Sequence, residues 1–491
     1  MLSTAEIKSF IDQDNASPLK IKAKEGLRYY EGQHDILDYR MFYFNSDGVL
    51  KEDKTRSNVK IPHQFFTELV DQGTQHILSG EEGIFKSDIP ELQKWLDIYF
   101  NKNRSFKSEL AETITGQQAK GFDYMYAYQG KDDRLVFENA DCIGVVEVEG
   151  RFTEDGKDQR IYRYVDRIDK EGKTQWKILV VDDENTYFYC QTDSGEIELD
   201  KTAELNPRPH SLYRDKKGNL FTRPDAPKHL PFFRLDMNKK RFSLLKSVKL
   251  LIDDYDIHAS GLTNNLIDFD HPIYFVRGFE GDNLDELQRN LKTKKMMGAP
   301  EGSDLEIKTI DIPFEARKLK LELDEKSIYR FGMGLNLAGL KDTSATTNIA
   351  IKAAYSLLEL RCKKMQEQIG KFLEEILEAV LAEINYKEKT DYRAEQVDFV
   401  FKPEIMSNAL ENAQIELTDA QKQQVQITTL LNLATQLDRE TLMQRVCDVL
   451  DINYDDIKDK LPEQDNSLED FGMAKETLDG IEPEGDVIEE I

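Results

Sequence analysis

The chain has 491 residues, and its 66 basic and 93 acidic side chains give a formal net charge of −27. This length predicts about three domains with enough chain to bury real cores. No run approaches 18 apolar residues, which excludes a membrane-spanning helix, and the first residues lack the basic-then-apolar layout of a secretion signal. The four cysteines lie far apart without a C-x-x-C pair, which excludes a zinc finger and favours a reducing compartment.

The acidic charge is unevenly distributed. Residues 451–491 carry 15 acidic and three basic side chains, so we expect an acidic, disordered tail from residue 466 to residue 491. Residues 239–341 carry 17 basic and 17 acidic side chains and are neutral. The overall charge excludes an ordinary nucleic-acid binder with a basic surface, although the neutral segment departs from the rest of the chain.

Residues 1–80 are predicted to be helical. A helix starts at Ser17-Pro18 and ends at Gly32, and further helices are expected at residues 63–79, 89–101 and 105–121. From residue 135 to residue 233 the apolar period changes to two, which predicts an antiparallel meander of hairpins. Its candidate strands, separated by glycine-containing turns, are residues 143–149, 160–168, 175–181, 186–191 and 196–199.

The helical period then returns. It predicts a helix at residues 243–269, and Pro313 predicts the start of another at residues 314–331, which Gly332 and Gly334 end. Between them we expect a compact strand–helix–strand unit at residues 272–277, 284–295 and 305–310.

The strongest helical signal covers residues 346–384. Apolar residues keep the three-four spacing from Ile369 to Ile384, and we interpret this stripe as intra-subunit core rather than as an interface. A short strand at residues 396–402 and a helix at 438–449 follow.

Motifs for catalysis, nucleotide binding or metal binding are weak. Gly172-Lys173-Thr174 resembles the end of a phosphate loop but falls in a predicted hairpin, and the glycines around Met333 fit a helix end better than a dinucleotide fingerprint. No histidine has a partner at metal-ligand spacing, and His258 is interpreted as a structural polar contact. The adjacent pair Asp253-Asp254 fits a solvated helix face. We therefore predict no catalytic residue, no metal and no cofactor.

The order of the pieces resembles the portal proteins of tailed bacteriophages, in particular long-tailed phages of Gram-positive hosts. The resemblance covers about residues 20–465 and consists of many weak matches in the same order. The matching stretches are Tyr29-Tyr30-Glu31-Gly32, Asn58-Val59-Lys60-Ile61-Pro62, Glu68-Leu69-Val70-Asp71, Leu230-Pro231-Phe232-Phe233, Asn238-Lys239-Lys240, and Leu340-Lys341-Asp342-Thr343-Ser344 leading into Asn348-Ile349-Ala350-Ile351-Lys352-Ala353.

The resemblance implies an α+β, mainly helical, multi-domain fold that assembles into a dodecameric ring around a DNA channel. It implies the following parts: a wing (residues 1–238), a first stem helix (239–269), a clip (270–312), a second stem helix (313–334), a tunnel loop (335–345), a long wing helix (346–387), a crown (388–465) and the acidic tail (466–491).

The implied function is a phage portal protein, through whose ring double-stranded DNA is packaged, retained and ejected. The implied partners are other copies of the chain (about twelve in the particle or thirteen in isolation), double-stranded DNA bound without sequence preference, the terminase large subunit, the scaffolding protein, the major capsid protein and the head-completion (adaptor) proteins, with no membrane contact. The implied location is the portal vertex of the virion, after assembly in the host bacterial cytoplasm. The alternatives are another phage structural subunit, such as an adaptor or baseplate protein, or an enzyme.

Three groups of residues are the candidate sites. Those of the tunnel loop are Asn336, Gly339, Leu340, Lys341, Asp342, Thr343 and Ser344. Those expected to bring positive charge to the channel from the stem are Lys239, Lys240, Arg241 and Lys246, for which an ordinary solvated helix start is the alternative. Those expected to dock partners at the clip are Arg289, Lys292, Lys294 and Lys295, for which a solvated helix face is the alternative.

A channel has to hold DNA without binding it tightly. Each neutralised phosphate strengthens salt-dependent binding, and a ring multiplies the charge of every subunit. A stem and clip of zero net charge inside an acidic assembly would therefore favour movement of DNA.

Overall fold

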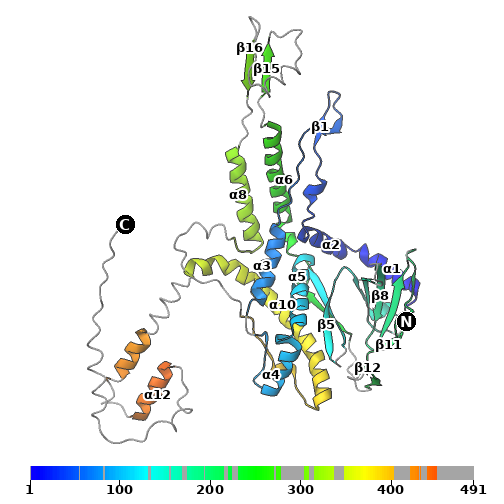
Figure 1. Ribbon diagram of the computed structural model, residues 1–491, viewed down its shortest axis with the longest axis vertical. Helices are drawn as coiled ribbons and strands as arrows, with labels where there is room; N and C mark the ends of the chain where they lie inside the picture. The colour runs from blue at the N-terminus through cyan, green and yellow to red at the C-terminus, as the bar shows by residue number, and fades with distance from the viewer. Residues whose placement is uncertain are drawn as a thin grey trace. The chain divides into compact units, whose positions relative to one another are not determined.

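The computed structural model describes residues 2–54, 56–80, 83–130, 134–153, 156–167, 174–192, 194–214, 219–223, 230–269, 273–277, 304–308, 314–336, 348–402, 421–430, 432 and 439–450. It divides into two units, Met1–Met406 and Ser407–Ile491 (Figure 1). In the second unit, α12 spans Arg439–Leu450, which agrees with the helix expected there. The acidic tail lies outside the described residues. The first unit combines helices with antiparallel sheets, as expected for an α+β fold.

The N-terminal helices form where the start and stop signals predict them. They are α1 (Thr4–Asn15), α2 (Pro18–Tyr30), α3 (Phe65–Leu78), α4 (Pro90–Leu96) and α5 (Arg104–Lys120). Ser17 accepts a hydrogen bond from the Lys20 amide at the start of α2. Gly121 ends α5 with φ at 95°, and a side chain there would collide with the Arg241 carbonyl oxygen.

Residues 1–80 were expected to contain helices only, and the structure adds strands at residues 42–52, between the helix that ends before Gly32 and the one predicted from residue 63. β1 (Phe42–Phe44) and β2 (Leu50–Glu52) form an antiparallel hairpin there. The turn between them is stabilised by the Asn45 side chain, which accepts from the amides of Asp47 and Val49. Gly48 supplies the positive φ that the turn requires. The signal for this hairpin was present, because an aromatic run followed by Asn, Asp and Gly is a strand-and-turn pattern.

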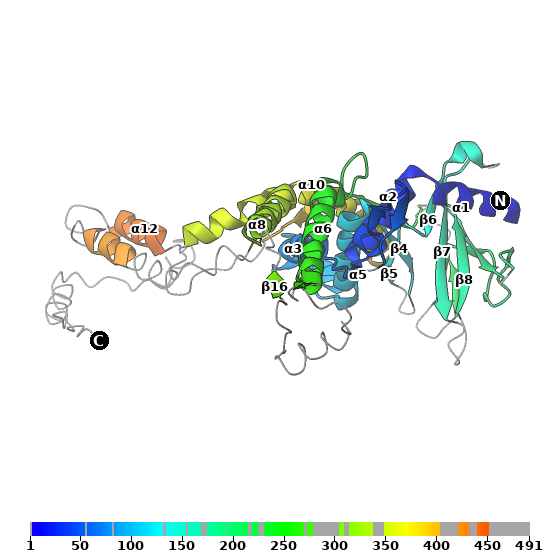
Figure 2. The same cartoon turned by 90° about the horizontal axis from the view of Figure 1, so that it is seen from above.

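The meander is confirmed for its central strands. β6 (Val145–Val148), β7 (Gln159–Arg167), β8 (Thr174–Val181), β9 (Asn185–Gln191) and β10 (Ile197–Leu199) pair antiparallel in sequence order. β11 (Arg208–Pro209) joins β9, and a separate hairpin consists of β12 (Leu212–Arg214) and β13 (Leu220–Thr222). α1 covers one face of the large sheet, where Ile7 and Ile11 pack on Val148 and Ile161 (Figure 2).

A second sheet was not predicted as such. β4 (Phe122–Gln129) lies between β14 (Phe232–Asp236) and β5 (Leu135–Ala140). The first residues of β4 are buried in succession instead of alternating, so a search for period two does not detect this strand.

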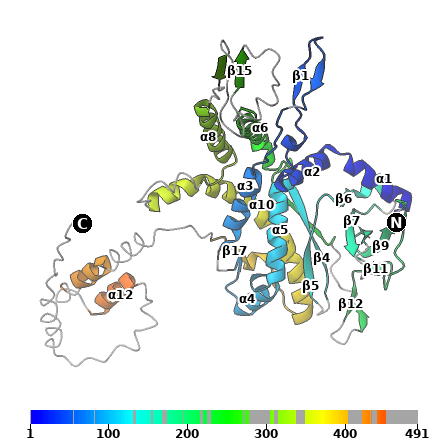
Figure 3. The same ribbon diagram turned by 45° about the horizontal axis from the view of Figure 1, so that its top comes forward.

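The two helices expected near the middle of the chain lie side by side (Figures 1 and 3). They are α6 (Leu245–Phe269) and α8 (Phe314–Phe331). Between them in sequence, β15 (Ile273–Arg277) and β16 (Asp304–Lys308) form an antiparallel pair, which confirms both strands of the predicted strand–helix–strand unit. The predicted helix at residues 284–295 lies outside the described residues.

The long helix is confirmed as α10 (Asn348–Glu388), whose 41 residues extend for about 60 Å at 1.5 Å per residue. Its apolar stripe is buried in the largest core of the first unit, as predicted. The members of this stripe are Ile369, Phe372, Leu373, Ile376, Leu377, Val380, Leu381 and Ile384. The strand expected after it is reduced to β17 (Asp398–Phe399), which pairs with β3 (Phe85–Lys86).

Candidate functional site

The pair α6 and α8 is held together by polar contacts. The Lys320 ammonium bridges Asp254 of α6 and Asp324 of its own helix. Arg317 of α8 lies within hydrogen-bond distance of the Asn265 side chain of α6, at 2.6 and 2.8 Å. His258 lies 3.4 Å from Asp254, so its interpretation as a structural polar contact is confirmed.

An extended segment is fastened along α6 by a regular set of hydrogen bonds, which we call the polar ladder. In each bond a side chain of α6 accepts from a backbone amide of the extended segment. The pairs are Asp256 with His63 (2.9 Å), Ser260 with Ile61 (3.1 Å), Asn264 with Val59 (2.7 Å) and Asp268 with Ser57 (3.1 Å). Four residues of helix rise about 6.0 Å and two residues of extended chain about 6.6 Å, so every fourth helical residue meets every second amide. The ladder fixes the chain that follows the β1–β2 hairpin.

Asp256, the first residue of the ladder along α6, is fully buried. It accepts hydrogen bonds from the rings of His34, at 2.7 Å, and His63, at 2.8 Å. Burial by itself would raise the pKa of Asp256, but the bonds from the two histidines and the His63 amide outweigh it and lower the pKa. The carboxylate therefore stays ionised and joins α6 to the segment before α3.

The C-terminal end of α8 is anchored by α3 and α10. Gln72 makes two hydrogen bonds with the backbone of Leu335, donating to its carbonyl at 2.8 Å and accepting from its amide at 2.9 Å. The buried Arg361 of α10 donates to the carbonyl oxygens of Gly332, at 3.0 Å, and Leu69, at 2.7 Å. The helix-end interpretation of Gly332 is confirmed, and the chain leaves α8 in a position fixed by two other helices.

Several predicted stem residues are described. Lys239 and Lys240 are exposed, and Lys246 is exposed beside the Phe242 ring, 3.7 Å from its centroid. Arg241 differs, because its guanidinium lies 3.2 Å from Glu147 and 3.5 Å from Asp236. Its charge is neutralised within the subunit.

The other candidate residues are only partly covered. Asn336 donates to Glu325 of α8 at 3.2 Å. The remaining residues of the tunnel loop and the clip group lie outside the described residues, and they are Gly339, Leu340, Lys341, Asp342, Thr343, Ser344, Arg289, Lys292, Lys294 and Lys295.

Three cations on α8 were missed by the reasoning from sequence. Lys318, Lys326 and Arg330 lie on the exposed face of α8, and none forms an ion pair with another described residue. The i, i+4 spacing of Lys326 and Arg330 would have placed them on one face.

Over the described lengths of α6 and α8 there are seven Lys and Arg and eight Asp and Glu residues, so the pair of helices has a net charge of −1.

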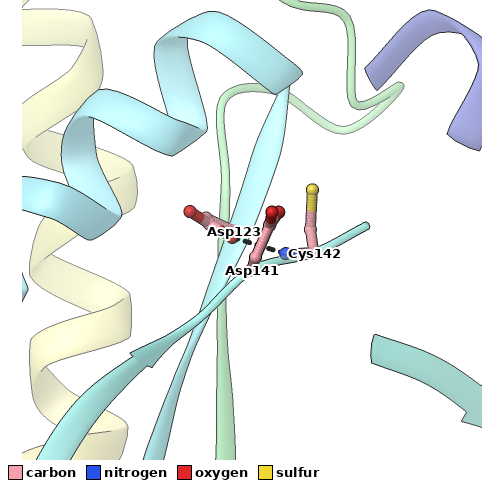
Figure 4. Close-up of side chains that lie close together, drawn as sticks. All are labelled: Asp123, Asp141 and Cys142. Atoms are coloured by element: carbon pink, nitrogen blue, oxygen red, sulfur yellow. Dashed lines mark hydrogen bonds between the residues drawn. The ribbon is translucent and has the colours of Figure 1, made fainter. Parts of the chain in front are cut away.

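One cluster outside α6 and α8 has side chains that could bind a metal. Asp123, Asp141 and Cys142 bring two carboxylates and a thiol within 4.8 Å of one another (Figure 4). The Lys120 ammonium already lies between the carboxylates, 2.9 Å from Asp123 and 2.8 Å from Asp141. Burial raises the pKa of the Cys142 thiol well above its ordinary value, so no thiolate is offered. The cluster is a buried ion-pair network whose residues do not fit a metal.

The phosphate-loop interpretation of Gly172-Lys173-Thr174 is excluded by the strand pairing. Arg167 of β7 pairs with Thr174 of β8, so the motif joins two antiparallel strands and does not precede a helix. Among the described residues, no helix combines the length and the apolar character needed to cross a membrane.

Comparison with known proteins identifies the family. The family model "Phage portal protein, SPP1 Gp6-like" matches residues 11–460. The portal protein of Bacillus phage SPP1 is 26% identical over 372 residues, which cover 74% of this chain and 70% of that protein. The portal protein of Clostridium phage phiCD119 is 31% identical over 191 residues, or 38% and 41% of the two chains. A chain from the neck of an empty GTA particle covers 80% of this chain with 10% identity and a TM-score of 0.41, and 91% of that chain is matched. The match over nearly the whole length means that this chain belongs to the SPP1 Gp6-like family of phage portal proteins.

Proposed function

We propose that about twelve copies of this chain form a ring at one vertex of the capsid, and that double-stranded DNA is packaged, retained and ejected through its central channel. The family match over residues 11–460 carries this proposal and favours a portal over an adaptor or baseplate subunit. The family is structural, which argues against the enzyme alternative.

In this proposal the parts of the chain have separate roles. Residues 1–238 and 346–387 are the wing, α6 and α8 belong to the stem, residues 270–312 are the clip, residues 335–345 are the tunnel loop, and residues 388–465 are the crown. The way Gln72 and Arg361 fix the end of α8 supports a tunnel loop whose starting point is rigid. The clip is the docking surface for the terminase and the head-completion proteins, and the scaffolding and major capsid proteins contact the outside of the ring.

The charge of α6 and α8 suits a channel that DNA slides through. The pair is close to neutral, and the exposed cations Lys318, Lys326 and Arg330 are accompanied by the exposed Glu322 of α8. Ring symmetry would repeat these charges in every copy, so each subunit would attract phosphates at a few points without a net positive surface.

Negative-stain imaging of the purified protein tests the proposal. We expect hollow rings of about twelve or thirteen subunits with a bore wide enough for a duplex. Compact single copies, or six-fold assemblies without an axial hole, would refute it.

A further inference from the structure

The β1–β2 hairpin has one apolar face that no other described part of the subunit covers. Its register pairs Phe42 with Glu52, Tyr43 with Lys51 and Phe44 with Leu50. Because directly paired residues share a face and neighbours along a strand alternate, Phe42, Phe44 and Leu50 lie on one face, while Tyr43 and Lys51 lie on the other. The exposed fractions on the apolar face are 55% for Phe42, 71% for Phe44 and 54% for Leu50.

The apolar face of the hairpin leaves a contiguous hydrophobic patch in water. Taking roughly 200 Å² for a large side chain, the three residues leave on the order of 300 Å² of apolar surface in water, which is in the range of the largest patches on monomeric proteins, and such patches are often functional. A two-stranded hairpin without further packing is only marginally stable. The hairpin therefore has the properties of an element completed by a partner.

The chain that follows the hairpin is fixed within the subunit. The polar ladder attaches the chain directly after it to α6, with the Val59 amide and carbonyl both bonded to Asn264. Because this attachment is made within the subunit, residues 57–63 do not have to be ordered when a partner binds the hairpin.

The same chain carries a second uncovered apolar surface that matches the first. On α8, Leu319 and Leu323 are spaced four residues apart on one face and are 57% and 52% exposed. Lys318 and Lys326 lie near them without an ion pair to another described residue, and Glu52 beside Phe42 is likewise exposed. The two surfaces are thus complementary in apolar character and in charge.

The β1–β2 hairpin and α8, which carry the two surfaces, lie on opposite sides of α6, as Figures 1 and 3 both show. A ring built head to tail requires each copy to present two different, complementary surfaces on opposite sides. We propose that the β1–β2 hairpin of one copy packs its apolar face on Leu319 and Leu323 of α8 in the next copy, so that adjacent stems are joined by the hairpin. This inference rests on the proposed ring and names the contact that closes it.

Disulfide trapping tests the contact directly. Phe44→Cys and Leu323→Cys are introduced together into a chain with Cys190→Ser, the partly exposed native cysteine. Oxidation is expected to give a ladder of covalent oligomers on a denaturing gel. The matched control, Tyr43→Cys with Leu323→Cys, has its first cysteine on the opposite face and is expected to give no ladder. Equal ladders from both, or rings without a ladder from the first, would overturn the inference while leaving the proposed ring intact.

A second experiment does not depend on cross-linking. Phe42→Ser with Phe44→Ser should raise the protein concentration needed for ring assembly at least about tenfold, because large apolar anchors dominate interfaces. Tyr43→Ser should leave it unchanged. Since all three side chains are exposed in the subunit, the urea midpoint of the unassembled protein should be the same for both variants. Unchanged ring assembly by the double variant would refute the contact, whereas absence of rings from the unmodified protein would refute the proposed function itself.

Discussion

Arg241 was expected at the channel, and its contacts give it a role inside the subunit. It has a left-handed backbone conformation with φ at 54°, and its guanidinium is directed at Glu147, which Arg234 also contacts. Arg160 lies 3.8 Å from the same carboxylate. Burial would raise the pKa of Glu147, but the three guanidinium groups outweigh it and lower the pKa to about 2. The network joins the large sheet to the start of α6.

This network predicts a defined pH dependence. Because the pKa of Glu147 is about 2 in the folded chain and 4.5 ordinarily, its ionised form stabilises the fold above pH 4.5, and this contribution is lost as the pH falls toward 2. Glu147→Gln should lower the free energy of unfolding at pH 7 by about 2–3 kcal/mol, since it removes the carboxylate that three partly buried guanidinium groups share, although Asp236 stays beside Arg234 and Arg241. The difference from the unmodified protein should shrink below pH 4.5.

Urea unfolding at several pH values below the concentration of ring assembly measures this effect. The control is Glu149→Gln, whose partner Arg151 is exposed, so a change below about 0.5 kcal/mol is expected. A difference for Glu147→Gln that stays constant down to pH 3 would contradict the assignment.

At the scale of elements, the polar ladder explains why α6 has a polar stripe that is nevertheless buried. Asp256, Ser260 and Asn264 are almost completely buried in a helix that otherwise presents apolar residues to α3. Such residues would be costly without partners, and each is paired with a backbone amide of the extended segment. The ladder therefore specifies the register between α6 and the chain that carries the hairpin.

Asn264→Leu should loosen that segment without unfolding the subunit. It removes both hydrogen bonds to Val59, so amide exchange at residues 57–63 should become at least about tenfold faster, while α10 keeps its protection. Hydrogen exchange with mass spectrometry measures this. Thr263→Ala, the neighbouring position off the ladder, should leave residues 57–63 unchanged, and equal acceleration in the two variants would argue against the ladder.

At the scale of the whole molecule, the charge distribution matters more than the total of −27. The described parts of α6 and α8 are close to neutral within a strongly acidic chain. A ring repeats the charge of each subunit, so a small change on α8 becomes a large change along the channel.

Reversing two charges on α8 tests whether the near-neutral charge of α6 and α8 controls how tightly the ring holds DNA. Glu315→Lys with Glu322→Lys changes the net charge of the pair from −1 to +3 in each copy. Rings of this variant should retain double-stranded DNA roughly tenfold or more tightly at low salt, with a steep loss as salt rises, and should package it more slowly. Glu374→Lys with Glu378→Lys on α10 makes the same charge change away from the stem and should have little effect. Equal DNA retention by both variants would show that α8 does not face the channel.

The local patterns of the sequence were sufficient to predict most helices and to suggest the family. α8 begins and ends at the residues that Pro313 and the two glycines indicate, and the stripe from Ile369 to Ile384 is buried as expected. These features depend on neighbours within about one helical turn, which a single sequence displays. The β1–β2 hairpin was missed although its turn residues are equally local.

The pairings between distant residues were decided only by the tertiary structure. β4 lies between β14 and β5, Arg241 meets Glu147, and α6 meets a segment about 200 residues earlier in the chain. A buried run such as β4 carries no period, and an ion pair or ladder between distant residues leaves no spacing in the sequence. Which distant residues meet depends on how whole helices and sheets pack against one another. The sequence therefore determines the secondary-structure elements, and only the folded chain determines which of their side chains stay exposed and unpaired.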